Sequence, residues 1–291
     1  MTRAHFAGLN TAMFAEVLEG HPVLISYADI IRRPGVWRDE ILPRLQRNAY
    51  LAPILDSGAF TELTTQGFHV SIEEYSEFVL EYGSLFDQVI TLDDIGGDIE
   101  RTWLNTAYLL DDVAGIDGIG TVIPVFHGRE PIEVLHHYCQ RFERVAIGFA
   151  RDFGRISPDQ GNGASPDAWL RQVLDVIEGY GVDVHGLGMT RYARQNGHGR
   201  LTTTDSTTWI AEFRALSKGD GGRSHGTRGA ARDALDGLSR IQLAKLAVLS
   251  YYGHGACEGM RQILADSWGQ ARTAFRRYSA RDLAAAIAVV R

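Results

Sequence analysis

The chain contains little cysteine and no long apolar run, and these absences exclude several classes of protein. Its two cysteines, Cys139 and Cys257, are too few for a disulfide scaffold or a four-cysteine zinc site. No stretch approaches the roughly 18–20 apolar residues of a membrane helix. The opening segment, MTRAHFAGLN, lacks the basic-then-apolar order of a signal peptide. We therefore expect a soluble, cytoplasmic protein with no membrane partner.

Charges of both signs are present, but they are unevenly distributed. The net charge is −7, from 29 basic and 36 acidic residues. Residues 214–291 carry 13 basic and 6 acidic side chains, whereas residues 1–213 carry 16 and 30. An acidic body with a basic C-terminal part would meet a polyanion through one face only. Surface arginines that serve only solubility explain the same counts, and charge alone favours that simpler interpretation.

Short apolar runs alternate with amphipathic segments along most of the chain. Helical spacing is found at 11–20, 71–83 and 130–143, and Ser71 followed by Glu74 has the pattern of a capping box. The candidate strands are residues 5–9, 22–26, 51–55, 88–92, 121–126, 144–149, 182–188 and 201–205. This alternation predicts a parallel α/β fold with right-handed crossovers. Eight strands favour a (β/α)8 barrel, and a doubly wound sheet is the alternative.

The sequence also predicts how the chain is divided. We expect residues 1–217 to form the barrel and residues 218–233, rich in Gly, Arg and Ser, to form a flexible loop. Residues 234–291 then predict a basic, helical C-terminal part packed on the barrel.

Three aspartates stand where candidate strands end. Asp56 and Asp93 directly follow apolar runs, and Asp205 ends another. The carboxyl ends of parallel strands meet at one face, so these side chains are expected to gather there, although such an aspartate often only caps the next helix. Displacement at a sugar carbon uses paired carboxyl groups. Metal-dependent hydrolysis is also open, because Asp56, Asp93, Asp94 and Asp205 would offer the oxygen ligands that Mg²⁺ prefers.

A series of motifs then points to one family. ILDSGAF (54–60) resembles the Asp-Ser-Gly-Gly-Phe strand end of tRNA-guanine transglycosylases. The same order continues through TLDD (91–94), VFHG (125–128), VAIGFA (145–150), HGLGM (185–189) and TTDSTTW (203–209). The Asp-Ser-x-x-Trp form at 205–209 and the compact length are most similar to the phage and bacterial relatives that insert 7-deazaguanines into DNA. The resemblance implies a (β/α)8 barrel that exchanges guanine for a 7-deazaguanine, such as 7-cyano-7-deazaguanine, without cutting the backbone and without a cofactor.

The resemblance also implies a role for each matched residue. Asp205 corresponds to the nucleophile that attacks C1′ and forms a covalent sugar–enzyme intermediate. Asp56 corresponds to the general acid and base, and Asp93 to the carboxylate that reads N1–H and the exocyclic amine of the purine. The other residues implied to surround the base are Ser57, Gly58, His127, Gly128, Gly148 and Gly188.

Two departures from the tRNA enzymes bear on the polymer. His127 stands where they have glutamine, and only Cys257 follows Asp205, so their Cys-x-Cys-x-x-Cys…His zinc site has no counterpart. We therefore expect DNA as the partner and no metal site, with tRNA as the alternative and a non-catalytic nucleic-acid-binding barrel as a third reading. The residues expected to contact phosphate are Arg272, Arg276 and Arg277.

Overall fold

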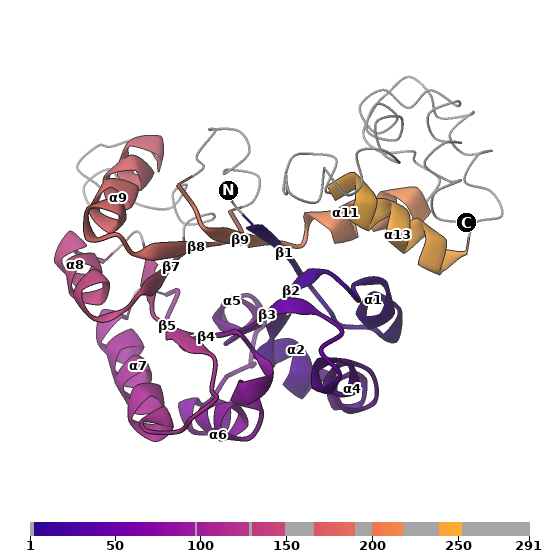
Figure 1. Cartoon of the computed structure of the whole chain (residues 1–291), viewed down its shortest axis with the longest axis horizontal. Helices are drawn as coiled ribbons and strands as arrows, with labels where there is room; N and C mark the ends of the chain where they lie inside the picture. Colours follow the sequence, from indigo (N-terminus) through magenta and orange to yellow (C-terminus); the bar gives the residue numbers. More distant parts are fainter. Residues whose placement is uncertain are drawn as a thin grey trace.

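The strands form one parallel sheet that curves into a barrel (Figure 1). The computed structural model describes residues 3–96, 98–127, 130–148, 166–189, 200–217 and 239–251. In chain order the strands are β1 (Arg3–Ala7), β2 (Pro22–Ser26), β3 (Leu51–Asp56), β4 (Gln88–Ile90), β5 (Thr121–Ile123), β6 (Val125–His127), β7 (Arg144–Gly148), β8 (Asp183–Leu187) and β9 (Thr203–Ser206). Every candidate strand of the sequence is present, and the predicted TIM-type barrel is confirmed.

The strand predicted at 121–126 is divided in two by a proline. Pro124 has no N–H to donate, and it separates β5 from β6 by a single residue. Before it, β5 pairs with β4 and Thr91 N–H donates to the Ile123 carbonyl at 3.0 Å. At Pro124 itself the carbonyl accepts from Ala146 N–H at 2.8 Å, and β6 pairs with β7. One continuous segment therefore joins both ends of the sheet order and brings the barrel close to closure.

On the opposite side, the first strand lies between β2 and the last strand of the barrel. β1 pairs with β9, where Arg3 is opposite Thr203. The indole N–H of Trp209, in the helix after β9, donates to the Ala7 carbonyl at 2.8 Å. These contacts join the beginning of the chain to a segment about two hundred residues later.

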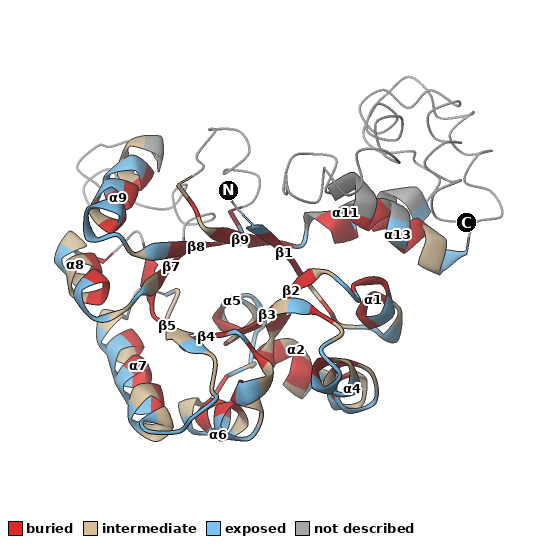
Figure 2. Cartoon of the chain, in the orientation of Figure 1, coloured by how far each residue is buried: buried red, intermediate tan, exposed pale blue. Residues whose placement is uncertain are grey.

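The helices lie around the sheet, with buried faces toward the strands (Figure 2). They are α1 (Ala12–Val17), α2 (Tyr27–Arg32), α3 (Pro34–Val36), α4 (Leu42–Gln46), α5 (Ala59–Thr64), α6 (Ile72–Tyr82), α7 (Ile99–Val113), α8 (Ile132–Arg141), α9 (Pro166–Tyr180), α11 (Thr208–Ser217) and α13 (Arg240–Tyr251). The helices predicted at 11–20, 71–83 and 130–143 correspond to α1, α6 and α8. Ser71 caps α6 as expected, because its hydroxyl accepts from Glu74 N–H at 3.3 Å.

The pleat of the strands decides which side chains face the barrel interior. Residues two apart on a strand point to the same side. The small interior cluster consists of Ala7, Leu24, Ile54, Ile90, Ile123, Val125 and Ala146. Their strand neighbours belong instead to two larger clusters shared with the helices. Asp56 follows Ile54 by two residues, and His127 follows Val125 by two. The alternation that builds the core thus also directs these polar groups inward.

The start of the predicted C-terminal part packs on the barrel. Leu243, Ala244, Ala247 and Val248 of α13 are buried in the same cluster as α1 and α11. The predicted loop at 218–233 and the segment after residue 251 lie outside the described residues. No helix within the described ranges is long and apolar enough to cross a membrane.

Candidate active site

The three predicted carboxylates come together at the carboxyl ends of the strands. Asp56 ends β3, Asp93 follows β4 by three residues, and Asp205 lies in β9. Asp93 and Asp205 are buried, with 7% and 9% of their surface exposed, and Asp56 is intermediate. Both buried aspartates act electrostatically on Asp56, so the three carboxyl groups share one site.

Asp56 is the carboxyl group most strongly affected by this arrangement. Burial raises the pKa of Asp56 to about 7 from its ordinary value of 3.8, and the negative charges of Asp93 and Asp205 act in the same direction. The hydrogen bond that Asp56 accepts from the Gly58 N–H partly opposes the rise. A carboxyl group with a pKa near neutrality can both release and accept a proton at physiological pH.

Asp205 is held from the neighbouring strand. Its Oδ1 accepts from Gly188 N–H at 2.8 Å and lies 3.3 Å from Nε2 of His185. The other ring nitrogen of His185 is 2.8 Å from Oγ1 of Thr203. Gly188 has φ +65, in the left-handed region that favours glycine, so a glycine there lets the turn after β8 aim its N–H at Asp205. His185 is fully buried inside the barrel, and its ring lies against the predicted nucleophile.

A second histidine stands beside His185 inside the barrel. The ring of His5, on β1, lies 6.0 Å from that of His185, and its Nε2 is 3.1 Å from the Ala52 carbonyl. Burial, together with the smaller effect of nearby His185, lowers the pKa of His5 to about 3. His5 is therefore neutral at physiological pH, and it lies next to His185 as a polar but uncharged side chain.

Asp93 is bound by His127 from the next strand. Nε2 of His127 is 2.5 Å from Oδ2 of Asp93, and the Ser57 hydroxyl is 3.5 Å from the other carboxylate oxygen. Gly148 makes room for this histidine, because a Cβ at position 148 would lie 2.5 Å from Cε1 of the imidazole. The family resemblance implies that Gly148 lies beside the base. In this structure the adjacent space is filled by the His127 ring.

Gly58 shapes the turn that follows Asp56. Its φ is +89, and its N–H donates to Oδ2 of Asp56 at 3.1 Å. A Cβ at this position would lie 2.4 Å from the Cβ of Ala28. Both the backbone conformation and the packing therefore require glycine here, and the turn anchors the carboxyl group of Asp56.

Sequence reasoning missed a fourth acidic residue near the site. Glu130 is 8% exposed, and its Oε2 has no hydrogen-bond partner within the described part of the chain. Burial raises the pKa of Glu130 to about 7, against the influence of His127, and Asp93 adds to the rise. We expected a helix from residue 130. In the structure α8 starts at Ile132, because Pro131 disfavours helical geometry at the residue before it. The Glu-Pro pair was the available signal that Glu130 lies in the loop.

A buried tyrosine lies near the carboxyl groups of Asp56 and Asp93. Tyr75 of α6 is fully buried, and its hydroxyl donates to the Ile90 carbonyl at 2.7 Å. Burial raises the pKa of Tyr75 well above its ordinary value, and the charges of Asp56 and Asp93 contribute. The residue stays a neutral hydrogen-bond donor, and its position in an amphipathic helix gave no indication of this role.

Four predicted contact residues cannot be placed. Gly128, Arg272, Arg276 and Arg277 lie outside the described residues. Among the described residues, no group of three or more His, Cys, Asp or Glu side chains has an arrangement that would hold a metal ion. Asp94, a candidate magnesium ligand in the sequence, instead pairs with Arg101 at 2.9 Å.

The arrangement separates three chemical tasks among three carboxyl groups. Asp56 is suited to proton transfer, and Asp205 is oriented by an N–H and an imidazole. Asp93 is held by His127 through Oδ2, and because each carboxylate oxygen accepts more than one hydrogen bond, it keeps acceptor sites for a ligand with two adjacent donors. Two comparisons with known proteins add no relative: no family model matches the chain, and no curated protein matches it significantly.

Proposed function

We propose that the chain is a transglycosylase that exchanges guanine in DNA for a 7-deazaguanine. The main support is that Asp56, Asp93 and Asp205, from distant parts of the sequence, all lie at the carboxyl ends of the strands, where Gly188 holds Asp205 and His127 holds Asp93. The order of motifs from residue 54 to residue 209 supports the same assignment. Each motif aspartate that the family resemblance implies is thus present in one site.

In the first half of the proposed reaction, guanine leaves the sugar. An Asp205 oxygen attacks C1′ and forms a carbon–oxygen bond, while the bond from C1′ to guanine N9 breaks. Protonated Asp56 gives its proton to the departing base, so the leaving group is neutral. The Gly188 N–H and His185 fix the orientation of the nucleophilic carboxylate.

In the second half, the incoming base replaces the enzyme on the sugar. Ionised Asp56 takes the proton from N9 of the 7-deazaguanine, N9 bonds to C1′, and the Asp205 ester bond breaks. A pKa of about 7 suits a group that must act first as acid and then as base. Asp93 accepts hydrogen bonds from N1–H and the exocyclic amine, an edge on which adenine offers no matching donors. Ser57, Gly58, His127, Gly148 and Gly188 support these groups.

DNA is favoured over tRNA because the zinc-bearing part of the tRNA enzymes has no counterpart in the sequence. For a duplex, the target nucleotide must leave the stack, at a cost of a few kcal/mol. Phosphate contacts would offset that cost and make binding dependent on salt.

The test is release of labelled guanine from DNA or tRNA in the presence of 7-cyano-7-deazaguanine. We expect release from DNA by the unaltered protein and none by Asp205→Asn. In the absence of an incoming base, a denaturant-stable adduct should join residue 205 to the oligonucleotide. Exchange on tRNA alone would favour the tRNA alternative, and binding without adduct or exchange would favour the non-catalytic barrel. Chelator-sensitive cleavage would indicate a metal-dependent hydrolase.

A further inference from the structure

Helix α7 buries polar side chains on a face that would ordinarily be apolar. Thr102, Asn105 and Thr106 are buried beside Leu109, whereas Leu104 on the other face is 63% exposed. Burying a hydroxyl or an amide costs free energy unless it forms hydrogen bonds.

Two of these side chains hold the backbone on either side of Asp93. The Asn105 amide donates to the Leu92 carbonyl at 3.1 Å. The Asp94 N–H donates to Oγ1 of Thr102 at 2.8 Å. These are the two peptide groups that flank the α-carbon of Asp93, one before it and one after it. Fixing both peptide planes restrains the backbone dihedral angles of Asp93, and with them the direction of its Cα–Cβ bond, while His127 holds the carboxylate itself.

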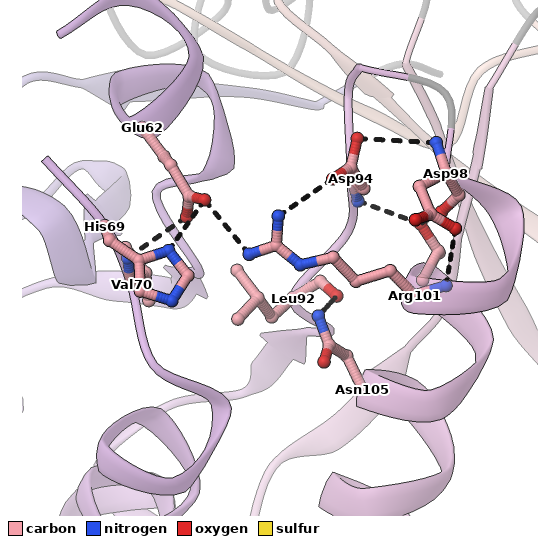
Figure 3. Close-up of polar contacts among 9 residues, drawn as sticks. Glu62, His69, Val70, Leu92, Asp94, Asp98, Arg101 and Asn105 are labelled. Carbon is pink, nitrogen blue, oxygen red and sulfur yellow. Dashed lines mark hydrogen bonds and ion pairs between the residues drawn. The ribbon is translucent and has the colours of Figure 1, made fainter. Parts of the chain in front are cut away.

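A third α7 residue, Arg101, connects the loop after β4 with helix α5, which follows β3. The Arg101 guanidinium binds Asp94 at 2.9 Å and Glu62 of α5 at 3.0 Å, and it lies between the two carboxylates in Figure 3. Helix α5 follows the Gly58 turn, which anchors Asp56. Arg101 therefore links the loop that carries Asp93 to the helix that follows Asp56.

The link continues into the segment before α6. Glu62 also accepts from the Val70 N–H at 3.1 Å and lies 2.9 Å from Nδ1 of His69. Both carboxylate oxygens of Glu62 are thus engaged, one by Arg101 and His69 and the other by the backbone. This carboxylate is a fixed anchor for the guanidinium, which distinguishes the pair from an isolated surface ion pair.

We propose that Arg101, Thr102 and Asn105 are positioning residues that aim Asp93 at the two-donor edge of a guanine-type base and thereby set base specificity. The inference rests on the proposed function, in which Asp93 reads that edge. None of the three residues needs to touch the base. Their effect is transmitted through the peptide groups next to Asp93 and through the Asp94 side chain.

The test compares two bases that differ only in the exocyclic amine. Calorimetry would measure binding of 7-deazaguanine and 7-deazahypoxanthine to the full chain. We expect Thr102→Val to reduce the preference for 7-deazaguanine about five- to tenfold, close to the contribution of one hydrogen bond. Thr106→Val is the matched control, because Thr106 is buried one turn later on α7 and its hydroxyl has no partner in the described part of the chain. That variant should keep the preference.

A double-mutant comparison separates positioning from general damage to the fold. In an Asp93→Asn background, Thr102→Val should cause no further change in preference, because the group that it aims is already altered. Arg101→Gln, at a side chain that is 37% exposed, provides a variant expected to fold normally and to lose about threefold in preference.

Each remaining outcome is informative. An unchanged preference in both Thr102→Val and Arg101→Gln, or equal losses in Thr102→Val and Thr106→Val, would overturn the positioning role while leaving the proposed function intact. Failure of the unaltered protein to bind 7-deazaguanine would overturn the proposed function, and this inference with it.

Discussion

Replacing Asp56 by asparagine is expected to stabilise the folded protein above neutral pH. The pKa of Asp56 is about 7 in the folded chain, compared with an ordinary value of 3.8. The folded state therefore keeps a proton that the unfolded chain releases between these values. The proton stabilises the folded state fully below the ordinary pKa of 3.8, and this stabilisation is lost as the pH rises through about 7. Asparagine, which is neutral at every pH, avoids that loss.

The magnitude follows from the difference between the two pKa values. At 1.36 kcal/mol for each pH unit, it corresponds to about 4 kcal/mol. Asp56 remains partly accessible, and relaxation of the surrounding dipoles reduces the effect. We therefore expect Asp56→Asn to raise the free energy of unfolding at about pH 8 by about 1–3 kcal/mol, and to have little effect near pH 4.

Urea unfolding across this pH range provides the measurement, with the slope against urea concentration compared at each pH. Asp117→Asn is the matched control, because Asp117 is exposed in the turn before β5. It should leave the pH dependence unchanged. If the free energy of unfolding had the same pH dependence in Asp56→Asn and in the unaltered protein, the reasoning would be refuted. That result would mean that burial next to Asp93 and Asp205 does not disfavour the ionised form of Asp56.

Two further predictions concern the site, and a third concerns the C-terminal arginines. Gly148→Ala should displace His127 and reduce base exchange at least about tenfold, whereas Gly179→Ala, where a Cβ meets nothing within 4 Å, should retain activity in the same assay. Glu130→Gln should raise the free energy of unfolding above about pH 7 by about 1–3 kcal/mol and have less effect near pH 5, since the pKa of Glu130 is raised by burial; urea titrations would measure this. Neutralising the three C-terminal arginines expected to contact DNA should make the negative slope of log affinity against log salt shallower, by about one for each lost phosphate contact. An unchanged slope in binding titrations would argue against that docking face.

The strands were predictable because their signal is local. Each apolar run of the barrel, such as 51–55 or 144–149, is a short β-rich segment between turn residues, and all became strands. The division of the fifth strand was less apparent, because Pro124 interrupts pairing without ending the run. Its effect depends on which neighbours lie on each side, and that information is not contained in the segment itself.

The candidate site was predictable only in part. The three aspartates could be placed together because strand ends share one face of a parallel barrel. The contact of His185 with Asp205 could not, since a histidine within a strand is equally compatible with plain core packing. The three α7 residues that hold the Asp93 loop were also missed. Their role depends on a helix lying against a strand end, and a polar residue at a buried helix position has no distinctive local pattern.

The pairing of β1 with β9 has a consequence for synthesis of the chain. At translation rates of about 5–20 residues per second, roughly 10–40 s pass between the appearance of Arg3 and that of its partner Thr203. During this interval one edge of β1 has no strand beside it and exposes unpaired backbone groups to other nascent chains. That edge can be covered only after Thr203–Ser206 of β9 have left the exit tunnel, and the bond from Trp209 to the Ala7 carbonyl then forms last.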